Sequence, residues 1–263
     1  MDLTKIALLQ VDSSSTTSIQ SRIQNTLNNL EETLKQNPKL TILPELWATG
    51  AFMVEETKSA AKETLEQTLP QIKNLANKYR TWIHSGSFLE ETPSGTFNTS
   101  YLFDDKGEEV AKYRKIHLFG FDQGEATQLV AGEEVVVVPT PIGITGLVTC
   151  YDLRFPELFR AMIQKGANSF LITSGWPKKR LNHWNALLKA RAIENQAYVI
   201  ACNGIGTQTD NELGGNSQVI DPWGDIQIQA GEKAETLFTE IDIQKAGQVR
   251  EKMPVLADRV INQ

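Results

Sequence analysis

Short apolar runs alternate with segments of helical periodicity along this chain of 263 residues. The sequence KIALLQV, at Lys5–Val11, predicts a buried strand. From Ile19 to Leu34, apolar residues then recur at steps of three and four, which is the spacing of one helix face. Alternation of strands with helices implies right-handed crossovers and a mainly parallel sheet, so we expect an α/β fold.

The alternation continues through the chain, and hairpins add antiparallel strands. We expect further strands at Leu40–Leu43, Trp82–Leu89, Ser100–Phe103, Glu109–Ile116, Gly146–Tyr151, Phe170–Ser174 and Tyr198–Cys202. We expect further helices at Lys58–Tyr79, Pro156–Lys165 and Asn182–Gln196.

The two halves of the chain repeat one order of elements. The turns DDKG (104–107) and DPWG (221–224) occupy corresponding places, and each has Asp first and Gly fourth, as a type I turn prefers. No linker-like or low-complexity stretch separates the halves, and a chain of this length can bury roughly 70–75% of its unfolded surface. We therefore expect a single domain over residues 1–263, built from two similar sheets packed face to face with helices outside.

The charge and hydropathy of the chain exclude several kinds of partner. Its net charge of −6, from 26 basic and 32 acidic residues, argues against nucleic-acid binding, which requires a basic surface. No apolar run approaches the roughly 20 residues that span a bilayer. The first residues, MDLTKIALLQV, include an early acid and no basic segment, which is not typical of a signal peptide. We expect a soluble protein of the cytoplasm.

Cysteine and histidine are too few and too scattered for a metal centre or a disulfide framework. The two cysteines form no CxxC pair, and the histidines His84, His117 and His183 form no HxxxH or HExxH pair. We therefore expect no bound metal and no disulfide scaffold.

Three reactive side chains stand where predicted strands end, which is where functional groups collect in open α/β sheets. Glu45 follows a strand and Pro44, Lys115 closes EVAKYRK, and Cys150 closes GLVTC. Each could instead have an ordinary role: a loop carboxylate, a solvated basic edge, and a small buried hydrophobe. Strand alternation places Lys115 with Tyr113 on one face, away from its charged neighbours, and so indicates that Lys115 points inward.

Together the three side chains have the chemistry of acyl transfer. A free thiol is mostly protonated at neutral pH, so Cys150 requires a neighbouring cation or helix N-terminus to favour its thiolate, and Glu45 can accept its proton. Cys202 lies within the apolar run YVIACNG and is predicted to be a core residue.

Several blocks of the sequence resemble the nitrilase, or carbon–nitrogen hydrolase, superfamily. They follow the family's order through most of the chain: ILPELW (42–47), YRKIHLF (113–119), TCYDLRFPELFR (149–160), GWPKKRLNHWNALLKARAIENQAYVIACN (175–203), GGNSQVIDPWG (214–224) and VREKMPVLADR (249–259). The segment ARAIENQAYV is most similar to the omega-amidase branch, which hydrolyses ω-amides of dicarboxylic 2-oxo acids.

The resemblance implies a four-layer αββα sandwich and a catalytic triad at Glu45, Lys115 and Cys150. It implies no cofactor, and an assembly of two or more copies. It also implies a second glutamate between the lysine and the cysteine. In EATQLVAGE the spacing E-xxx-L-xx-G indicates Glu125 for that role, and the glutamates at 133 and 134 are less favoured candidates.

In the mechanism that this triad implies, Glu45 accepts the thiol proton as Cys150 attacks an amide carbon. Lys115 and the backbone N–H of Tyr151 form the oxyanion hole. Ammonia leaves, a thioester remains, and water activated by Glu45 hydrolyses it. Glu125 positions Lys115 in this scheme.

Two further residues are candidates for substrate binding. Arg154 lies four residues after Cys150 and can hold a substrate carboxylate, a role that the resemblance favours; it could instead form an ion pair with Glu157 or cap a helix. Trp176 can form an apolar wall of the site or pack in the core.

The expected activity is hydrolysis of a small linear amide that carries a carboxylate, with 2-oxoglutaramate and 2-oxosuccinamate as the indicated substrates. An N-carbamoyl hydrolase or a nitrilase would use the same triad. The sequence is also compatible with a Cys–His hydrolase that uses His117 or His84 as base, with a nucleotide-binding module at NGIGTQT (203–209), and with a catalytically silent binding scaffold.

Overall fold

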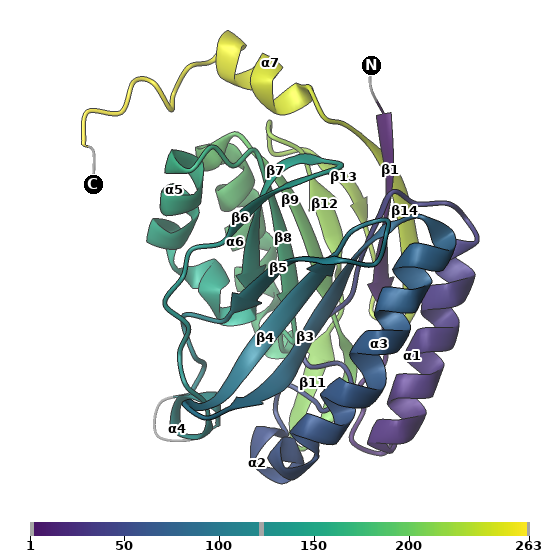
Figure 1. Ribbon diagram of the computed structural model, residues 1–263. Coiled ribbons are helices and arrows are strands. Elements are labelled where there is room, and N and C mark those ends of the chain that lie inside the picture. Colours follow the sequence, from purple (N-terminus) through teal and green to yellow (C-terminus); the bar gives the residue numbers. More distant parts are fainter. Residues whose placement is uncertain (1–2, 121–123, 262–263) are drawn as a thin grey trace.

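The computed structural model describes residues 3–120 and 124–261 and contains two six-stranded sheets, each flanked by helices (Figure 1). The first sheet contains β14 (Glu235–Asp242), β1 (Leu3–Gln10), β2 (Leu40–Ile42), β3 (Trp82–Thr92), β4 (Gly95–Phe103) and β5 (Glu109–Arg114), in that spatial order. The second contains β13 (Ile226–Gln229), β12 (Gln218–Ile220), β9 (Tyr198–Asn203), β8 (Ser169–Ser174), β7 (Gly143–Thr149) and β6 (Val137–Thr140).

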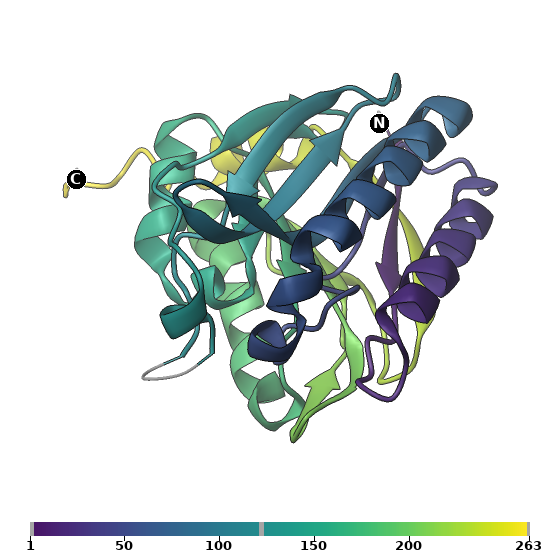
Figure 2. The ribbon, with the colours of Figure 1, turned by 60° about the horizontal axis from the view of Figure 1, so that its bottom comes forward.

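The sheets pack face to face with helices on their outer faces (Figures 1 and 2). The helices α1 (Ile19–Leu34) and α3 (Ala61–Tyr79) cover the first sheet, while α5 (Pro156–Gln164) and α6 (Leu181–Asn195) cover the second. The core between the sheets draws apolar side chains from both, among them Leu8 and Leu171. The predicted αββα sandwich is therefore confirmed.

The two sheets repeat one pattern of strand directions, as expected for two similar halves. In each, three parallel strands (β1–β2–β3 and β7–β8–β9) continue into an antiparallel hairpin, and an antiparallel strand borders the other edge. The two hairpin turns also match, because Asp104 and Asp221 each accept two backbone N–H groups at their Oδ1 atoms.

Shorter elements connect and border these layers. They are α2 (Val54–Thr57), α4 (Glu125–Gln128), α7 (Lys245–Lys252), the 3₁₀ turns η1 (Lys58–Ala60), η2 (Cys150–Arg154) and η3 (Lys178–Arg180), and the hairpin of β10 (Ile205–Gln208) and β11 (Asn211–Gly214). Within the described residues, no helix combines the length and apolar character needed to cross a membrane.

The structure corrects several predicted boundaries. Strand β5 ends at Arg114, so Lys115 lies just beyond it, and β7 ends at Thr149, so the predicted strand Gly146–Tyr151 is wrong at its end. The predicted helix Lys58–Tyr79 is also wrong at its start, because its first three residues form η1 and the long helix begins at Ala61. The segment NGIGTQT contains the last residue of β9 and the whole of β10, and it is followed by β11 rather than by a helix that could bind a phosphate.

Candidate active site

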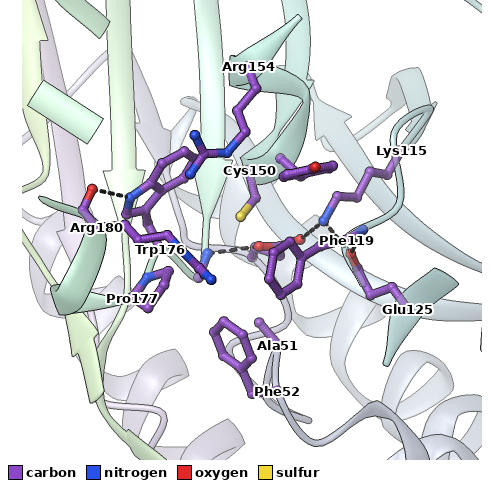
Figure 3. A pocket seen from close by; sticks show the side chains of 13 residues that line it. Ala51, Phe52, Lys115, Phe119, Glu125, Cys150, Arg154, Trp176, Pro177 and Arg180 are labelled. Carbon is purple, nitrogen blue, oxygen red and sulfur yellow. Dashed lines mark hydrogen bonds and ion pairs between the residues drawn. The ribbon is translucent and has the colours of Figure 1, made fainter. Parts of the chain in front are cut away.

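One cavity collects most of the candidate residues (Figure 3). Its lining comprises Glu45, Ala51, Phe52, Lys115, Phe119, Glu125, Cys150, Tyr151, Arg154, Gly175, Trp176, Pro177 and Arg180. These residues come from the segments that follow β2, β5, β7 and β8, together with the first residue of α4. The site thus lies where strands of both sheets end, as the sequence predicts.

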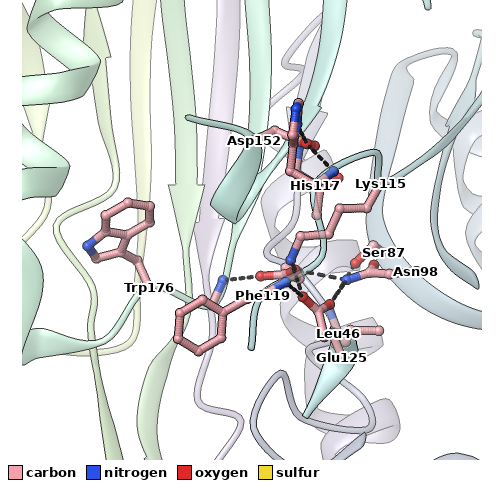
Figure 4. A network of polar contacts seen from close by, with 12 residues as sticks. Leu46, Ser87, Asn98, Lys115, His117, Phe119, Glu125, Asp152 and Trp176 are labelled. Carbon is pink, nitrogen blue, oxygen red and sulfur yellow. Dashed lines mark hydrogen bonds and ion pairs between the residues drawn. The ribbon is translucent and has the colours of Figure 1, made fainter. Parts of the chain in front are cut away.

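At the base of the cavity, Lys115 is held between two carboxylates (Figure 4). Its Nζ donates to Glu45 Oε1 at 2.8 Å and to Glu125 Oε2 at 2.6 Å. The amide of Asn98 on β4 donates to Glu45 Oε1 at 2.8 Å and to Glu125 Oε1 at 2.7 Å. All four side chains are buried, so Lys115 and Asn98 fix the two carboxylates in one network.

Burial and charge oppose each other in this cluster. Burial alone would lower the pKa of the Lys115 ammonium, but Glu125 and Glu45 hold this pKa well above its ordinary value. Burial raises the pKa of Glu125, and the nearby charge of Lys115 opposes that rise. Lys115 therefore stays positively charged inside the protein, which suits a group that stabilises a developing negative charge.

The backbone around Glu45 aims its carboxylate into the cavity. The N–H of Gly175, just after β8, donates to Glu45 Oε2 at 2.8 Å. The next residue along the chain from Glu45, Leu46, adopts a left-handed φ of +41°, and its N–H donates to Ser87 Oγ at 3.1 Å. One carboxylate oxygen of Glu45 is thus bound by Lys115 and Asn98, and the other faces the second sheet.

Cys150 is the first residue of η2 and has a left-handed φ of +48°. This conformation costs an L-residue about 1–2 kcal/mol, and it turns the chain sharply away from β7. Figure 3 shows the sulfur in the middle of the cavity, between the Lys115–Glu125 side and the Arg154–Trp176 side. The predicted straight strand through Tyr151 is broken by this turn.

The surroundings of Cys150 favour its protonated thiol. Burial raises the pKa of Cys150 above its ordinary value, the negative charge of Glu45 raises it further, and Lys115 opposes both effects. The effect of the Lys115 ammonium, considered from the sequence, is therefore outweighed by burial and by Glu45. A raised thiol pKa favours deprotonation that accompanies attack rather than precedes it.

A second network joins the segment that contains Lys115 to the turn that contains Cys150. Asp152 Oδ1 accepts from the backbone N–H of His117 at 2.9 Å and contacts its Nδ1 at 2.8 Å. Asp152 Oδ2 accepts from Tyr113 Oη at 2.6 Å and from the Thr149 N–H at 3.1 Å. Asp152 therefore fixes the position of η2 relative to the end of β5 (Figure 4).

The described histidines lie outside this cavity lining. His117 is bound to Asp152 and stacks on Phe155. His84 is buried, accepts from the Gly86 N–H, and burial lowers its pKa to about 3. These placements do not support a Cys–His hydrolase. Among the described residues there is also no group of three potential metal ligands.

The two candidate substrate-binding residues contact each other. The Arg154 guanidinium lies 4.6 Å from the Trp176 ring centroid, and Arg154 Nη1 is 3.3 Å from His183 Nδ1. Among the ion pairs of the described residues, none joins Arg154 to Glu157. Trp176 is 2% exposed, so it is a wall of the cavity and also a packed residue.

Tyr151 also lines the cavity, in the first turn of η2, where backbone N–H groups lack partners within the helix. Its N–H is therefore available to an oxyanion beside Cys150. The glutamates at 133 and 134 are exposed and lie outside the lining of this cavity, whereas Glu125 is bound to Lys115.

Asn98, Phe119 and Arg180 are among the residues of the site that sequence reasoning missed. Asn98 sits in the apolar strand FNTSYLF, where a polar residue at a buried position is a weak signal. Phe119 and Arg180 belong to blocks that carry the family resemblance, but nothing in their spacing separates them from packing or surface residues.

Comparison with known proteins gives matches over most of the chain. A family model described as carbon-nitrogen hydrolase matches residues 5–251. The chain is 38% identical to a 2-oxoglutaramate amidase of Paenarthrobacter nicotinovorans, over 97% of this chain and 88% of that protein. It is 40% identical to a 2-oxoglutaramate amidase of Bacillus subtilis, over 82% of this chain and 83% of that protein.

A solved structure matches the fold. The crystal structure of Saccharomyces cerevisiae Nit3, a member of the nitrilase superfamily, has a TM-score of 0.87 and 29% identity, covering 98% of this chain and 97% of that one. Its protein is named an omega-amidase.

Proposed function

The chain belongs to the carbon–nitrogen hydrolase family, as the resemblance of its sequence blocks predicts, and we propose that it hydrolyses the ω-amide of a small 2-oxo acid. The observation that supports this most directly is the buried Glu45–Lys115–Glu125 cluster, which shares one cavity with the Cys150 thiol and Arg154. The names of the relatives support 2-oxoglutaramate as the first substrate to test, with 2-oxosuccinamate as the second.

In the first half-reaction, the Cys150 sulfur attacks the amide carbon while its proton passes to Glu45. The carbonyl oxygen becomes an oxyanion, stabilised by the Lys115 ammonium and the Tyr151 N–H. Loss of one such donor costs about 2.7–4 kcal/mol of transition-state stabilisation. The carbon–nitrogen bond then breaks, Glu45 returns the proton to the leaving nitrogen, and ammonia departs from a thioester on Cys150.

In the second half-reaction, water attacks the thioester carbon and gives up a proton to Glu45. The same oxyanion donors act again, the carbon–sulfur bond breaks, and the thiol regains its proton from Glu45. The product is the free carboxylic acid. Glu125 keeps Lys115 in place and charged throughout, because it contacts Nζ at 2.6 Å. The cycle requires no metal and no organic cofactor.

Ammonia release distinguishes this function from the other activities of the family. We expect the protein to release ammonia from 2-oxoglutaramate much faster than from N-carbamoyl amino acids or simple nitriles. Activity on the carbamoyl compounds or nitriles alone would overturn the proposal.

The nucleophile is tested separately. Cys150→Ala should abolish turnover without unfolding the protein, whereas Cys202→Ala should change only stability, because Cys202 is buried between the two sheets. Circular dichroism checks the fold of both variants. Near-normal activity in folded Cys150→Ala would show that the thiol assignment is wrong.

We also propose that the protein acts as a homodimer in the cytoplasm. The exposed side chains of Ile193, Trp223 and Met253 line one hollow on the second half of the chain, which supports a self-association surface. A mechanism that depends on free Cys150 suits a reducing compartment, where thiols stay unpaired.

A further inference from the structure

Arg180 lies at the end of η3 and lines the same cavity as Cys150. Its carbonyl oxygen accepts from Trp176 Nε1 at 2.8 Å, which ties its backbone to a wall of the cavity. Its guanidinium lies 5.3 Å from the centroid of the Phe119 ring. The backbone of Arg180 is thus bonded to Trp176 (Figure 3), and its side chain lies over Phe119.

Arg180 shares the cavity with Arg154, and neither arginine forms an ion pair with a carboxylate of the described residues. The two lysines that precede Arg180 do have side-chain partners: Lys178 pairs with Glu212 and Glu232, and Lys179 donates to Asn211. The two guanidinium groups repel each other because neither is paired with a carboxylate. An anion bound beside them would reduce this repulsion.

The two arginines line one cavity and are joined through Trp176, whose ring centroid lies 4.6 Å from the Arg154 guanidinium and whose Nε1 donates to the Arg180 carbonyl oxygen at 2.8 Å. Desolvation lowers the pKa of Arg154, and the positive charge of Arg180 lowers it further. Their aromatic contacts keep both groups in place: Arg154 lies over Trp176, and Arg180 lies over Phe119. The positive charges are therefore oriented before any ligand enters, which reduces the entropy lost on binding.

The cavity consequently has two chemically different sides. Lys115 and Glu125, joined by an ion pair, lie on one side of the Cys150 sulfur, and Arg154 with Trp176 lies on the other (Figure 3). A substrate with a neutral amide at one end and an anion at the other fits this polarity in only one orientation.

We propose that Arg180 is a specificity residue that acts with Arg154 as a pair of guanidinium groups for the anionic end of the substrate. This inference rests on the proposed function and specifies its substrate class: ω-amides with a 2-oxo acid at the far end. A carboxylate with an adjacent keto group presents three acceptor oxygens near one plane. One bidentate guanidinium satisfies two of them, and a second guanidinium can reach the third. A neutral amide leaves both arginines unpaired.

The test compares a charged and a neutral substrate in Arg180→Met. For 2-oxoglutaramate, we expect KM to rise and kcat/KM to fall by about tenfold or more, the range of a lost charge-assisted hydrogen bond. For pentanamide, which has the same chain length and no charge, kcat/KM should stay within about twofold. Arg180→Lys should restore part of the preference for the charged substrate.

Lys179→Met is the matched control, because it removes the same charge from the adjacent residue of η3, which does not line this cavity. It should leave both substrates unaffected. Equal losses for the two substrates in Arg180→Met would show a structural role, and an unchanged preference would show no role; either result overturns the inference.

A binding measurement separates this inference from the proposed function. The dianion 2-oxoglutarate should protect Cys150 of the wild-type enzyme from alkylation by iodoacetamide, and Arg180→Met should weaken that protection about tenfold or more. If the wild type does not hydrolyse 2-oxoglutaramate but shows this Arg180-dependent protection, the proposed function fails, and only the assignment of Arg180 to 2-oxo acid binding stands. If neither the protection nor the substrate preference depends on Arg180, the inference fails by itself.

Discussion

At the scale of single residues, Cys150 and Lys115 have opposite electrostatic surroundings within one cavity. Lys115 keeps its charge because two carboxylates contact its Nζ. Cys150 is buried beside Glu45, so burial and that charge raise the pKa of its thiol despite Lys115. The site therefore maintains a permanent cation for the oxyanion and a neutral nucleophile that ionises only as it attacks.

This difference predicts how Cys150 alkylation depends on pH. Because its pKa is raised, the thiolate is scarce at neutral pH, and the rate of labelling by iodoacetamide should rise steadily from pH 7 to pH 9 without a plateau. Mass spectrometry of the labelled peptide measures that rate. Cys202 is fully buried and should label only after unfolding, so it serves as the internal control. A plateau below pH 8 would instead indicate a stable thiolate–ammonium pair.

The sequence indicates some residues of the site better than others. Strand alternation correctly places Tyr113 and Lys115 together in the interior, because the alternation persists one residue past the end of β5. Asn98 could not be identified in the same way. Its role depends on the meeting of Glu45 and Glu125, which lie 53 and 27 residues away in the chain.

At the scale of elements, the position of Glu45 depends on a close backbone approach between two segments. Gly86 in β3 has a φ of +70°, and a Cβ atom there would lie 2.0 Å from Pro44 O and 2.9 Å from Trp47 Cδ1. Only glycine fits, since the obstacle is the backbone of the residue that precedes Glu45.

Gly86→Ala should therefore displace the segment that contains Glu45. We expect a loss of stability beyond the roughly 1 kcal/mol typical of alanine at a positive φ, and a fall in kcat of about tenfold or more. Gly166→Ala is the matched control, because Gly166 has a φ of +90° with nothing within 4 Å of the added Cβ. Urea unfolding and steady-state kinetics compare the two variants. Equal stability losses with unchanged kcat would contradict this role for Gly86.

The elements that sequence patterns missed are mostly edge strands and turns. Strand β14, ETLFTEID, is largely polar and partly exposed, yet it pairs with β1 along its whole length. That pairing joins residues that are far apart in the chain, such as Leu3 and Asp242, which local periodicity does not reveal. The start of η2 was missed for a different reason: the left-handed turn at Cys150 serves the site rather than local propensity.

At the scale of the whole molecule, the two halves depend on each other. Strand β14 comes from the end of the described chain but completes the sheet of the first half. The core between the sheets contains side chains from both halves, and the site joins Glu45 and Lys115 from one sheet to Cys150 from the other. We therefore propose that the chain unfolds as one cooperative unit, since neither sheet can cover its inner face alone.

The surface hollow lined by Ile193, Trp223 and Met253 is the basis for a dimer in this proposal. These three side chains are about half exposed, at 47%, 48% and 49%, although they are large and apolar. The segment after α7 contributes Met253 and Val255 to this hollow, and Val260 farther along it is 92% exposed. If a second copy packed the same hollow against this one, the three apolar side chains of each copy would be buried in a symmetric interface.

Trp223→Asp tests that arrangement, because a buried tryptophan at an interface is often worth about 2 kcal/mol or more, which is about 30-fold in the dissociation constant. We expect the wild type to sediment as a dimer at micromolar concentration and Trp223→Asp to sediment as a monomer with an unchanged circular dichroism spectrum. Val110→Asp is the control, since Val110 is 38% exposed on β5, outside the lining of this hollow. A monomeric wild type would refute the dimer. A dimeric Trp223→Asp would place the contact elsewhere, because the variant removes the large apolar side chain that the proposed contact buries.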